Sequence, residues 1–171
     1  GNLGSFRKLI EVISPYAFSV ASRMMGNEED AKDIVQDAMV VIYQKIEKIK
    51  SPESFKTWVY KIVLNKCYDK LRSRKRTKEF RPDEKTWETI ANINSSADTS
   101  EMEYRETVHI IETLTERLSS VQKAVFLLSN IEGLDNDEIS GITGMSSHNV
   151  KASLHYARKK MCEMIKNHIG K

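Results

Sequence analysis

The chain has 171 residues, of which 40% are hydrophobic and 30% are charged, with only 7 Gly and 3 Pro. This composition favours an all-α protein. No apolar run approaches the length of a membrane span and no signal peptide precedes the first helical pattern, so we expect a cytoplasmic protein without membrane insertion. The formal charge of +3 hides a strong segregation, because residues 61–78 hold eight Lys or Arg against one Asp, whereas residues 79–112 hold nine acidic and three basic residues.

The helical patterns divide the chain into three parts. Residues 1–78 and 100–171 are helix-patterned, and residues 79–99 are too polar to offset the entropy of ordering the chain. We therefore predict two small helical domains joined by a flexible linker. Cys67 and Cys162 lack the spacing of a zinc site and are expected to be structural thiols in a reducing compartment.

Residues 30–49 form the first helix with a distinctive surface. Its core stripe, at spacings of three and four, is Ala31, Ile34, Val35, Ala38, Ile42, Ile46 and Ile49. The opposite face is polar, has Val40 near its middle, and consists of Asp33, Gln36, Asp37, Gln44 and Glu47. An apolar residue within a polar face indicates a partner surface. The alternatives are a solvated face with an isolated valine, or a carboxylate metal site at Asp30, Asp33 and Asp37, which no His or second acidic helix supports.

A basic helix follows at residues 54–76. Phe55, Val59, Ile62 and Val63 are expected to face the core, whereas Trp58 flanks a second stripe made of Thr57, Lys61, Asn65, Tyr68 and Arg72. Cations that follow phosphates and rings that stack on bases are typical of single-stranded nucleic-acid binding. The alternative is that Trp58 is a core aromatic and the lysines only solvate the helix.

Residues 134–161 predict two short helices joined by a tight turn, as in a DNA-binding helix-turn-helix. Asp135 with Glu138 forms a capping box, Gly144 supplies a positive φ at the turn, and Ser146 caps the second helix. A similar capping box, Ser119 with Gln122, begins a preceding helix that Gly133 ends. The residues expected to fill the angle between the two helices are Ile139, Ile142, Met145, Val150 and Leu154. The groove-facing set is His148, Asn149, Lys151, His155, Tyr156, Arg158 and Lys159.

Taken together, these segments resemble the bacterial RNA polymerase sigma factors of the extracytoplasmic-function (ECF) group, which carry sigma regions two and four. DAKDIVQDAMVVIYQKI and SFKTWVYKIVLNKCYDKLRSRKR resemble region two, and LSSVQKAVFLLSNIEGLDNDEISGITGMSSHNVKASLHYARKKM resembles region four. The resemblance covers nearly the whole chain. It implies residues 1–78 as region two, residues 79–99 as the linker and residues 100–171 as region four.

The resemblance also implies binding sites. Core polymerase would bind this chain through its flap and through the clamp helices of its largest catalytic subunit. The clamp helices would contact Asp33, Gln36, Asp37, Val40 and Gln44. The −10 promoter strand would contact Lys56, Trp58, Lys61, Asn65, Asp69 and Arg72. The −35 element would contact His148, Asn149, Lys151, Ala152, His155, Tyr156 and Lys159.

The implied function is to give core polymerase promoter specificity, to melt the promoter and to initiate transcription, under an anti-sigma partner. No nucleophile, base and orienting group occur together, so we expect no catalytic residues, no bound metal, no cofactor and no enzyme activity. Two alternatives remain: a stand-alone helix-turn-helix regulator that binds duplex DNA as a dimer, and a sigma-like decoy that binds polymerase or anti-sigma without initiating.

Overall fold

The computed structural model describes residues 2–49, 51, 54–77 and 110–169, and within these ranges every regular element is a helix. The all-α prediction is therefore confirmed. The linker at residues 79–99 and the first residues of the second predicted domain lie outside the described residues. The helices are α1 (Asn2–Met25), α2 (Glu28–Lys45), the short 3₁₀ helix η1 (Ile46–Lys48), α3 (Phe55–Thr77), α6 (Ser120–Asn130), α7 (Asn136–Thr143) and α8 (Ser147–Ile169).

Helices α1, α2 and α3 pack on one another because each buries an apolar stripe. Tyr60, Met24 and Ile42 are among the largest side chains that this packing removes from water. Asn27 caps α2 by accepting a hydrogen bond from the Asp30 backbone N–H at 3.0 Å. The three acidic residues of the first turn of α2 add a favourable interaction with the helix dipole.

The apolar stripe of α2 was predicted to continue in one helix to Ile49, and this is wrong. The α-helix ends at Lys45, and the chain tightens into η1, where the Ile49 N–H donates to the Ile46 carbonyl at 3.1 Å. The tighter turn ends in extended backbone at Ile49, which redirects the chain toward α3. Ile46 and Ile49 are therefore only half-buried.

Helices α6, α7 and α8 confirm the local signals of the helix-turn-helix. Ser119 and Gln122 form the predicted capping box before α6, and Asp135 and Glu138 form the one before α7. Gly144 ends α7 with φ 75°, a left-handed conformation that favours glycine. The residues predicted to fill the interhelical angle are buried, except Met145, which is half-buried: Ile139, Ile142, Val150 and Leu154.

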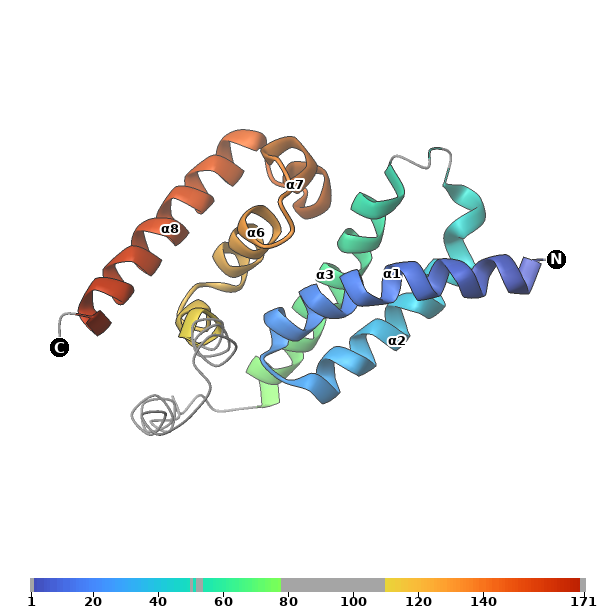
Figure 1. Ribbon diagram of the computed structural model, residues 1–171, viewed down its shortest axis with the longest axis horizontal. Coiled ribbons are helices and arrows are strands. Elements are labelled where there is room, and N and C mark those ends of the chain that lie inside the picture. The colour runs from blue at the N-terminus through green and yellow to red at the C-terminus, as the bar shows by residue number, and fades with distance from the viewer. Residues whose placement is uncertain (1, 50, 52–53, 78–109, 170–171) are drawn as a thin grey trace, which may run out of the picture.

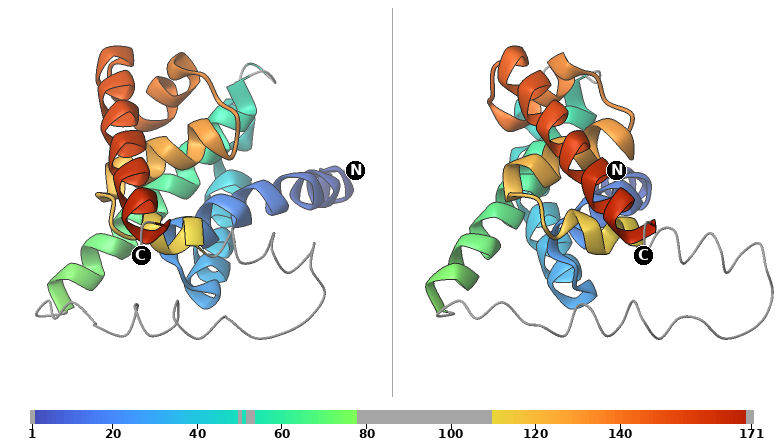
Figure 2. Two further views of the ribbon diagram at one scale, coloured as in Figure 1. Left: turned by 60° about the vertical axis from the view of Figure 1, so that its left-hand side comes forward. Right: turned by 90° about the vertical axis from the view of Figure 1, so that its left-hand side faces the viewer.

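The two helical groups lie against each other (Figure 1). Helix α7 contacts α3 and α6 contacts α1, and one continuous cluster of buried residues runs from α1–α3 into α6–α8. Helix α8 lies on the side of α6 and α7 away from α3, while the C-terminal end of α3 projects from the helical body (Figure 2). This arrangement determines which of the predicted surfaces are open.

Candidate polymerase and nucleic-acid interfaces

The outer face of α2 is exposed and includes an apolar patch. Val40 is 55% exposed and Tyr43 is 57% exposed. Asp33, Gln36, Asp37 and Gln44 surround Val40 and are also exposed. Sequence reasoning missed Tyr43, which lies beside the predicted face and packs its ring edge-on against Phe6, with ring centroids 4.9 Å apart. The exposed patch therefore combines an aromatic, an aliphatic, two acidic and two amide side chains.

Ion pairs join α2 to α3. Asp30 accepts from Lys70 Nζ at 3.1 Å and from the Arg74 guanidinium. Lys66 Nζ lies 3.5 Å from the Asp37 carboxylate, and Lys70 Nζ lies 4.0 Å from Asp33. Each of the three carboxylates considered for a metal site thus faces a cation of α3. In the ranges that the structure describes, no cluster of three His, Cys, Asp or Glu side chains could hold a metal ion.

Most of the predicted −10 residues share one side of α3. Trp58, Lys61, Asn65, Asp69 and Arg72 follow one another at helical spacing, and all but the half-buried Trp58 are exposed. Within this row Arg72 lies 3.8 Å from the Asp69 carboxylate, so the acidic side chain partly neutralises it. The row is a continuous polar and basic surface along α3.

Lys56 and Tyr68 do not belong to that row. Lys56 lies on the opposite side of α3, where its ammonium group is 5.5 Å from the ring centroid of Tyr16 and 5.6 Å from that of Tyr60. Tyr68, which the sequence placed in the basic stripe, packs against the core, and this burial raises its pKa to about 12. Its position three residues after Asn65 misled the prediction, because a spacing of three also leads around the helix toward the core.

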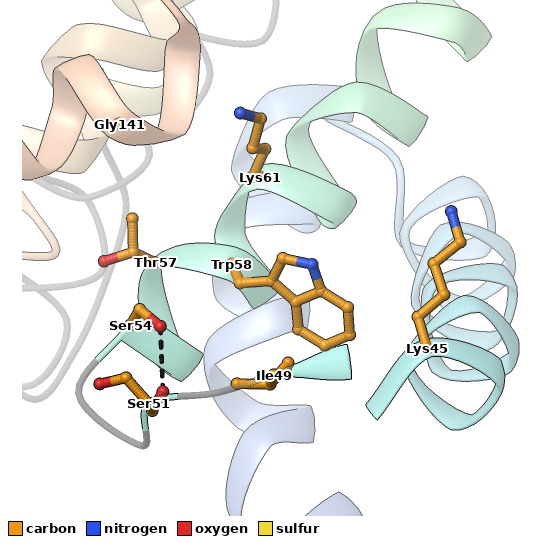
Figure 3. Close-up of a pocket in the computed structure, with 8 residues that line it drawn as sticks. All are labelled: Lys45, Ile49, Ser51, Ser54, Thr57, Trp58, Lys61 and Gly141. Atoms are coloured by element: carbon orange, nitrogen blue, oxygen red, sulfur yellow. Dashed lines mark hydrogen bonds between the residues drawn. The ribbon is translucent and has the colours of Figure 1, made fainter. Parts of the chain in front are cut away.

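A pocket of about 470 Å³ opens at the N-terminal end of α3 (Figure 3). Its lining combines two lysines, three hydroxyl side chains and the indole of Trp58, contributed by α2, the loop before α3, α3 itself and α7. The Trp58 ring lies over Ile49, and Ser54 Oγ donates to the Ser51 carbonyl at 2.9 Å. Trp58 therefore packs against the core and lines an open pocket at the same time. The full lining is Lys45, Ile49, Ser51, Ser54, Thr57, Trp58, Lys61 and Gly141.

The predicted −35 residues form one face of α8. Ser146 caps this helix by accepting from the Asn149 N–H at 3.2 Å. Ala152 is half-buried, and the other six predicted residues are exposed: His148, Asn149, Lys151, His155, Tyr156 and Lys159. The rings of His155 and Tyr156 meet edge to face at 5.8 Å. This face is therefore exposed in the free chain.

Arg158, which was also predicted to belong to the groove-facing set, is exposed and contacts α6 in the free chain. Its guanidinium reaches α6, where it donates to Asn130 Oδ1 at 3.1 Å and to Ser129 Oγ at 3.5 Å. Arg158 follows Lys151 by seven residues and so lies close to it around the helix, and its long side chain joins α8 to α6.

The two cysteines differ in their surroundings. Cys67 is buried in α3, where burial raises the pKa of its thiol to about 12, as expected for a structural thiol. Cys162 is a free thiol on the exposed side of α8, which the sequence did not predict. No helix in the described part of the chain is long and apolar enough to cross a lipid bilayer.

Comparison with known proteins identifies the family. The Sigma-70 region 2 model matches residues 9–77, and the Sigma-70, region 4 model matches residues 109–161. The chain is 31% identical over 144 residues to RNA polymerase sigma factor SigV of Bacillus subtilis (strain 168). The aligned region covers 84% of this chain and 81% of SigV. Other relatives are named ECF RNA polymerase sigma factors.

Two solved structures share the fold. One is the sigma factor RpoE in complex with the anti-sigma factor NepR from Bartonella quintana, with a TM-score of 0.70, 18% identity and coverage of 95% of this chain and 97% of that one. The other is CnrH in complex with the cytosolic domain of CnrY, with a TM-score of 0.69, 23% identity and coverage of 98% and 91%. On its matches to both sigma regions and to SigV, the chain belongs to the ECF group of RNA polymerase sigma factors.

Proposed function

We propose that this sigma factor binds core RNA polymerase through the outer face of α2, captures the unpaired −10 strand along α3, and contacts the −35 element with α8. The proposal rests on one observation above all. A single chain presents three separate exposed surfaces, one acidic and apolar, one basic with an open aromatic pocket, and one polar on a helix-turn-helix.

The α2 surface supports the polymerase contact. The aliphatic Val40 and the aromatic Tyr43 are each more than half exposed. They lie beside the carboxylates of Asp33 and Asp37. Buried aromatic and aliphatic residues surrounded by charge are typical of protein–protein interfaces. We assign Gln36 and Gln44 to the polar border of this contact, which would be made to the clamp helices of the largest catalytic subunit.

The α3 surface supports capture of an unpaired strand. Bases that have left the duplex expose their faces, and an indole such as Trp58 can stack on them while Lys61 and Lys45 attract the phosphates. Asn65 and Arg72 continue the path along the helix, with Asp69 between them. Lys56, on the other side of α3, does not share this path and is left out of the proposed strand contact.

The α8 surface supports contact with duplex DNA. The second helix of a helix-turn-helix enters the major groove, where side chains near its N-terminus reach base edges. Asn149 and Lys151 lie in the first turns, followed by His155 and Tyr156, while Lys159 can contact the phosphate backbone. His148 and Ala152 complete the face.

Partners follow from these assignments. Core polymerase, including its flap, and promoter DNA are the proposed partners, and the compartment that contains them is the cytoplasm. Because the structure of RpoE described above contains the anti-sigma factor NepR, we extend such a partner to this chain. The role is binding rather than catalysis, since the polymerase makes the RNA.

Reconstitution tests the proposal directly. The full chain is combined with core polymerase and a library of promoter templates, and transcripts are sequenced at their 5′ ends. We expect discrete start sites that depend on the added chain and share upstream sequence elements. A sigma-like decoy would bind core without producing transcripts, and a stand-alone regulator would bind duplex DNA as a dimer without polymerase. Either result contradicts the proposal.

A further inference from the structure

The turn after α6 makes a polar contact that joins the two helical groups. Glu132 lies in this turn, and its carboxylate accepts a hydrogen bond from Ser19 Oγ of α1 at 2.9 Å and from the Tyr60 hydroxyl of α3 at 2.5 Å. The partners are 113 and 72 positions away along the chain. One side chain of the second group therefore holds two helices of the first, and we call Glu132, Ser19 and Tyr60 the Glu132 latch.

The surroundings of the Glu132 latch make it stronger than a surface contact. Tyr60 is only 1% exposed, and Glu132 is half-buried. Burial and the hydrogen bond to Glu132 raise the pKa of the Tyr60 hydroxyl, which keeps it protonated as a donor. Hydrogen bonds to an ionised group contribute more than neutral ones, and removing the acceptor of a buried hydroxyl carries a desolvation penalty.

A second contact brings α7 onto the proposed strand-binding surface. A Cβ atom added at Gly141 would lie 3.6 Å from Thr57 Cγ2, so the backbone of α7 approaches α3 closely. Gly141 also lines the pocket that contains Trp58 and Lys61 (Figure 3). In this arrangement α7 forms one wall of the pocket, whereas Asn65 and Arg72, farther along α3, stay outside the contact.

Promoter geometry is incompatible with this closed arrangement. The position numbers that name the −35 and −10 elements differ by 25, which corresponds to ~85 Å of duplex at ~3.4 Å per base pair. Helices α3 and α7 are in direct contact here, so the two DNA-binding surfaces cannot reach both elements of one straight promoter. The two helical groups must separate before both surfaces are used together.

We propose that the Glu132 latch holds the free sigma factor closed, with α7 as a wall of the strand-binding pocket, so that opening of the latch controls access of the unpaired strand. This inference rests on the proposed function of α3. A latch of two hydrogen bonds can be shifted by a partner that binds the open form better, because a ligand displaces such an equilibrium by its difference in affinity.

A distance measurement tests the latch without any DNA. Cys162 is exposed and takes one spin label, and a Lys8→Cys variant provides the second on α1, while Cys67 stays unlabelled because its thiol is buried with a raised pKa. We expect a single, narrowly distributed distance for the otherwise unchanged full chain. Glu132→Gln and Tyr60→Phe should each raise the ratio of open to closed molecules about tenfold.

Matched controls separate opening from damage. Tyr60→Phe keeps the buried ring and removes only the hydroxyl, so the core of α1–α3 is preserved. Glu163→Gln removes one exposed carboxylate from α8 and should leave the distances unchanged. A free chain that is already mostly open, or a Glu132→Gln variant with the distances of the control, would overturn the latch.

A second measurement tests the link to the strand-binding pocket. In a Trp87→Phe background the fluorescence of Trp58 alone reports binding of short single-stranded DNA of mixed sequence to the full chain. We expect Glu132→Gln and Tyr60→Phe to bind this DNA about tenfold more tightly than the parent. Opening without any gain in strand affinity would refute control of the pocket by α7.

The two failures are distinguishable. If the distances shift as expected but no variant binds single-stranded DNA, the assignment of the pocket to the promoter strand is wrong and the inference about strand access falls with it. If strand binding and core-dependent transcription occur but the distances do not respond to Glu132, the proposed function stands and the latch is refuted.

Discussion

The exposed apolar residue at the centre of the acidic α2 face provides the sharpest test of polymerase binding. Val40 is 55% exposed in the free protein, so slightly more than half of its surface remains for a partner to bury. Fully burying a valine side chain contributes about 1.5–3 kcal/mol, so Val40→Ala should cost about 1 kcal/mol of binding, or about fivefold in Kd.

Val40→Asp should have a larger effect for an electrostatic reason. The new carboxylate would lie in the same face as Asp33 and Asp37 and would lose its hydration when the partner covers it. An unpaired buried charge costs about 3–5 kcal/mol, so we expect Kd to rise at least 100-fold. The folded chain itself should change little, because an exposed Asp within a helix costs under about 1 kcal/mol.

The assay is equilibrium binding of a fluorescently labelled chain to core polymerase, with circular dichroism to verify helicity and the melting temperature. Val12→Asp is the matched control, because Val12 is 63% exposed on α1. It should bind core polymerase like the parent chain. Retention of parental affinity by Val40→Asp, within about twofold, would remove the α2 face from the interface.

Three further outcomes are expected. Asp135→Ala removes the acceptor of two backbone N–H groups at 2.8 and 2.9 Å and should lower the free energy of unfolding, measured in urea, by about 1 kcal/mol. Asp135→Asn should retain most of the parental free energy of unfolding. Equal urea midpoints for the parent and both variants would contradict the capping role. Burial raises the pKa of Cys67 and of Tyr68 to about 12, so the folded state disfavours their ionised forms. The free energy of unfolding should therefore be unaffected below about pH 9 and should fall as the pH rises toward 12. Tyr68→Phe should weaken that alkaline loss, and an unchanged pH profile in urea unfolding would refute the assignment. Replacing Lys151 and His155 with Ala should change which −35 sequences support transcription in the promoter library, and identical promoter use would show that this face of α8 does not contact the bases.

Local signals in the sequence predicted much of the fold. The ends of α6 and α7 depend on capping residues within three positions, and the buried set of the helix-turn-helix depends on a spacing of three and four. Such interactions join neighbours in the chain, so the sequence alone reveals them. The early end of α2 at Lys45 escaped prediction because an apolar stripe continues through η1 at nearly the same spacing.

The candidate surfaces could be predicted only in part. The exposed faces of α2 and α8 follow from periodicity, which specifies the side opposite the core. The burial of Tyr68 could not be predicted in the same way, because the core covers a further side of α3 and periodicity does not say how many sides of a helix are covered. Arg158 turns to α6 for a similar reason.

The sequence by itself determined the helical class, the helix-turn-helix and the polar faces, because caps and helical periodicity act over a few residues. Only the tertiary structure decided that α7 packs against α3, that the pocket at Trp58 includes a residue of the second helical group, and that Glu132 joins Ser19 to Tyr60. The two hydrogen bonds of Glu132 join residues 113 and 72 positions apart. No local pattern encodes them, since they arise from how complete helices bury their apolar faces against one another.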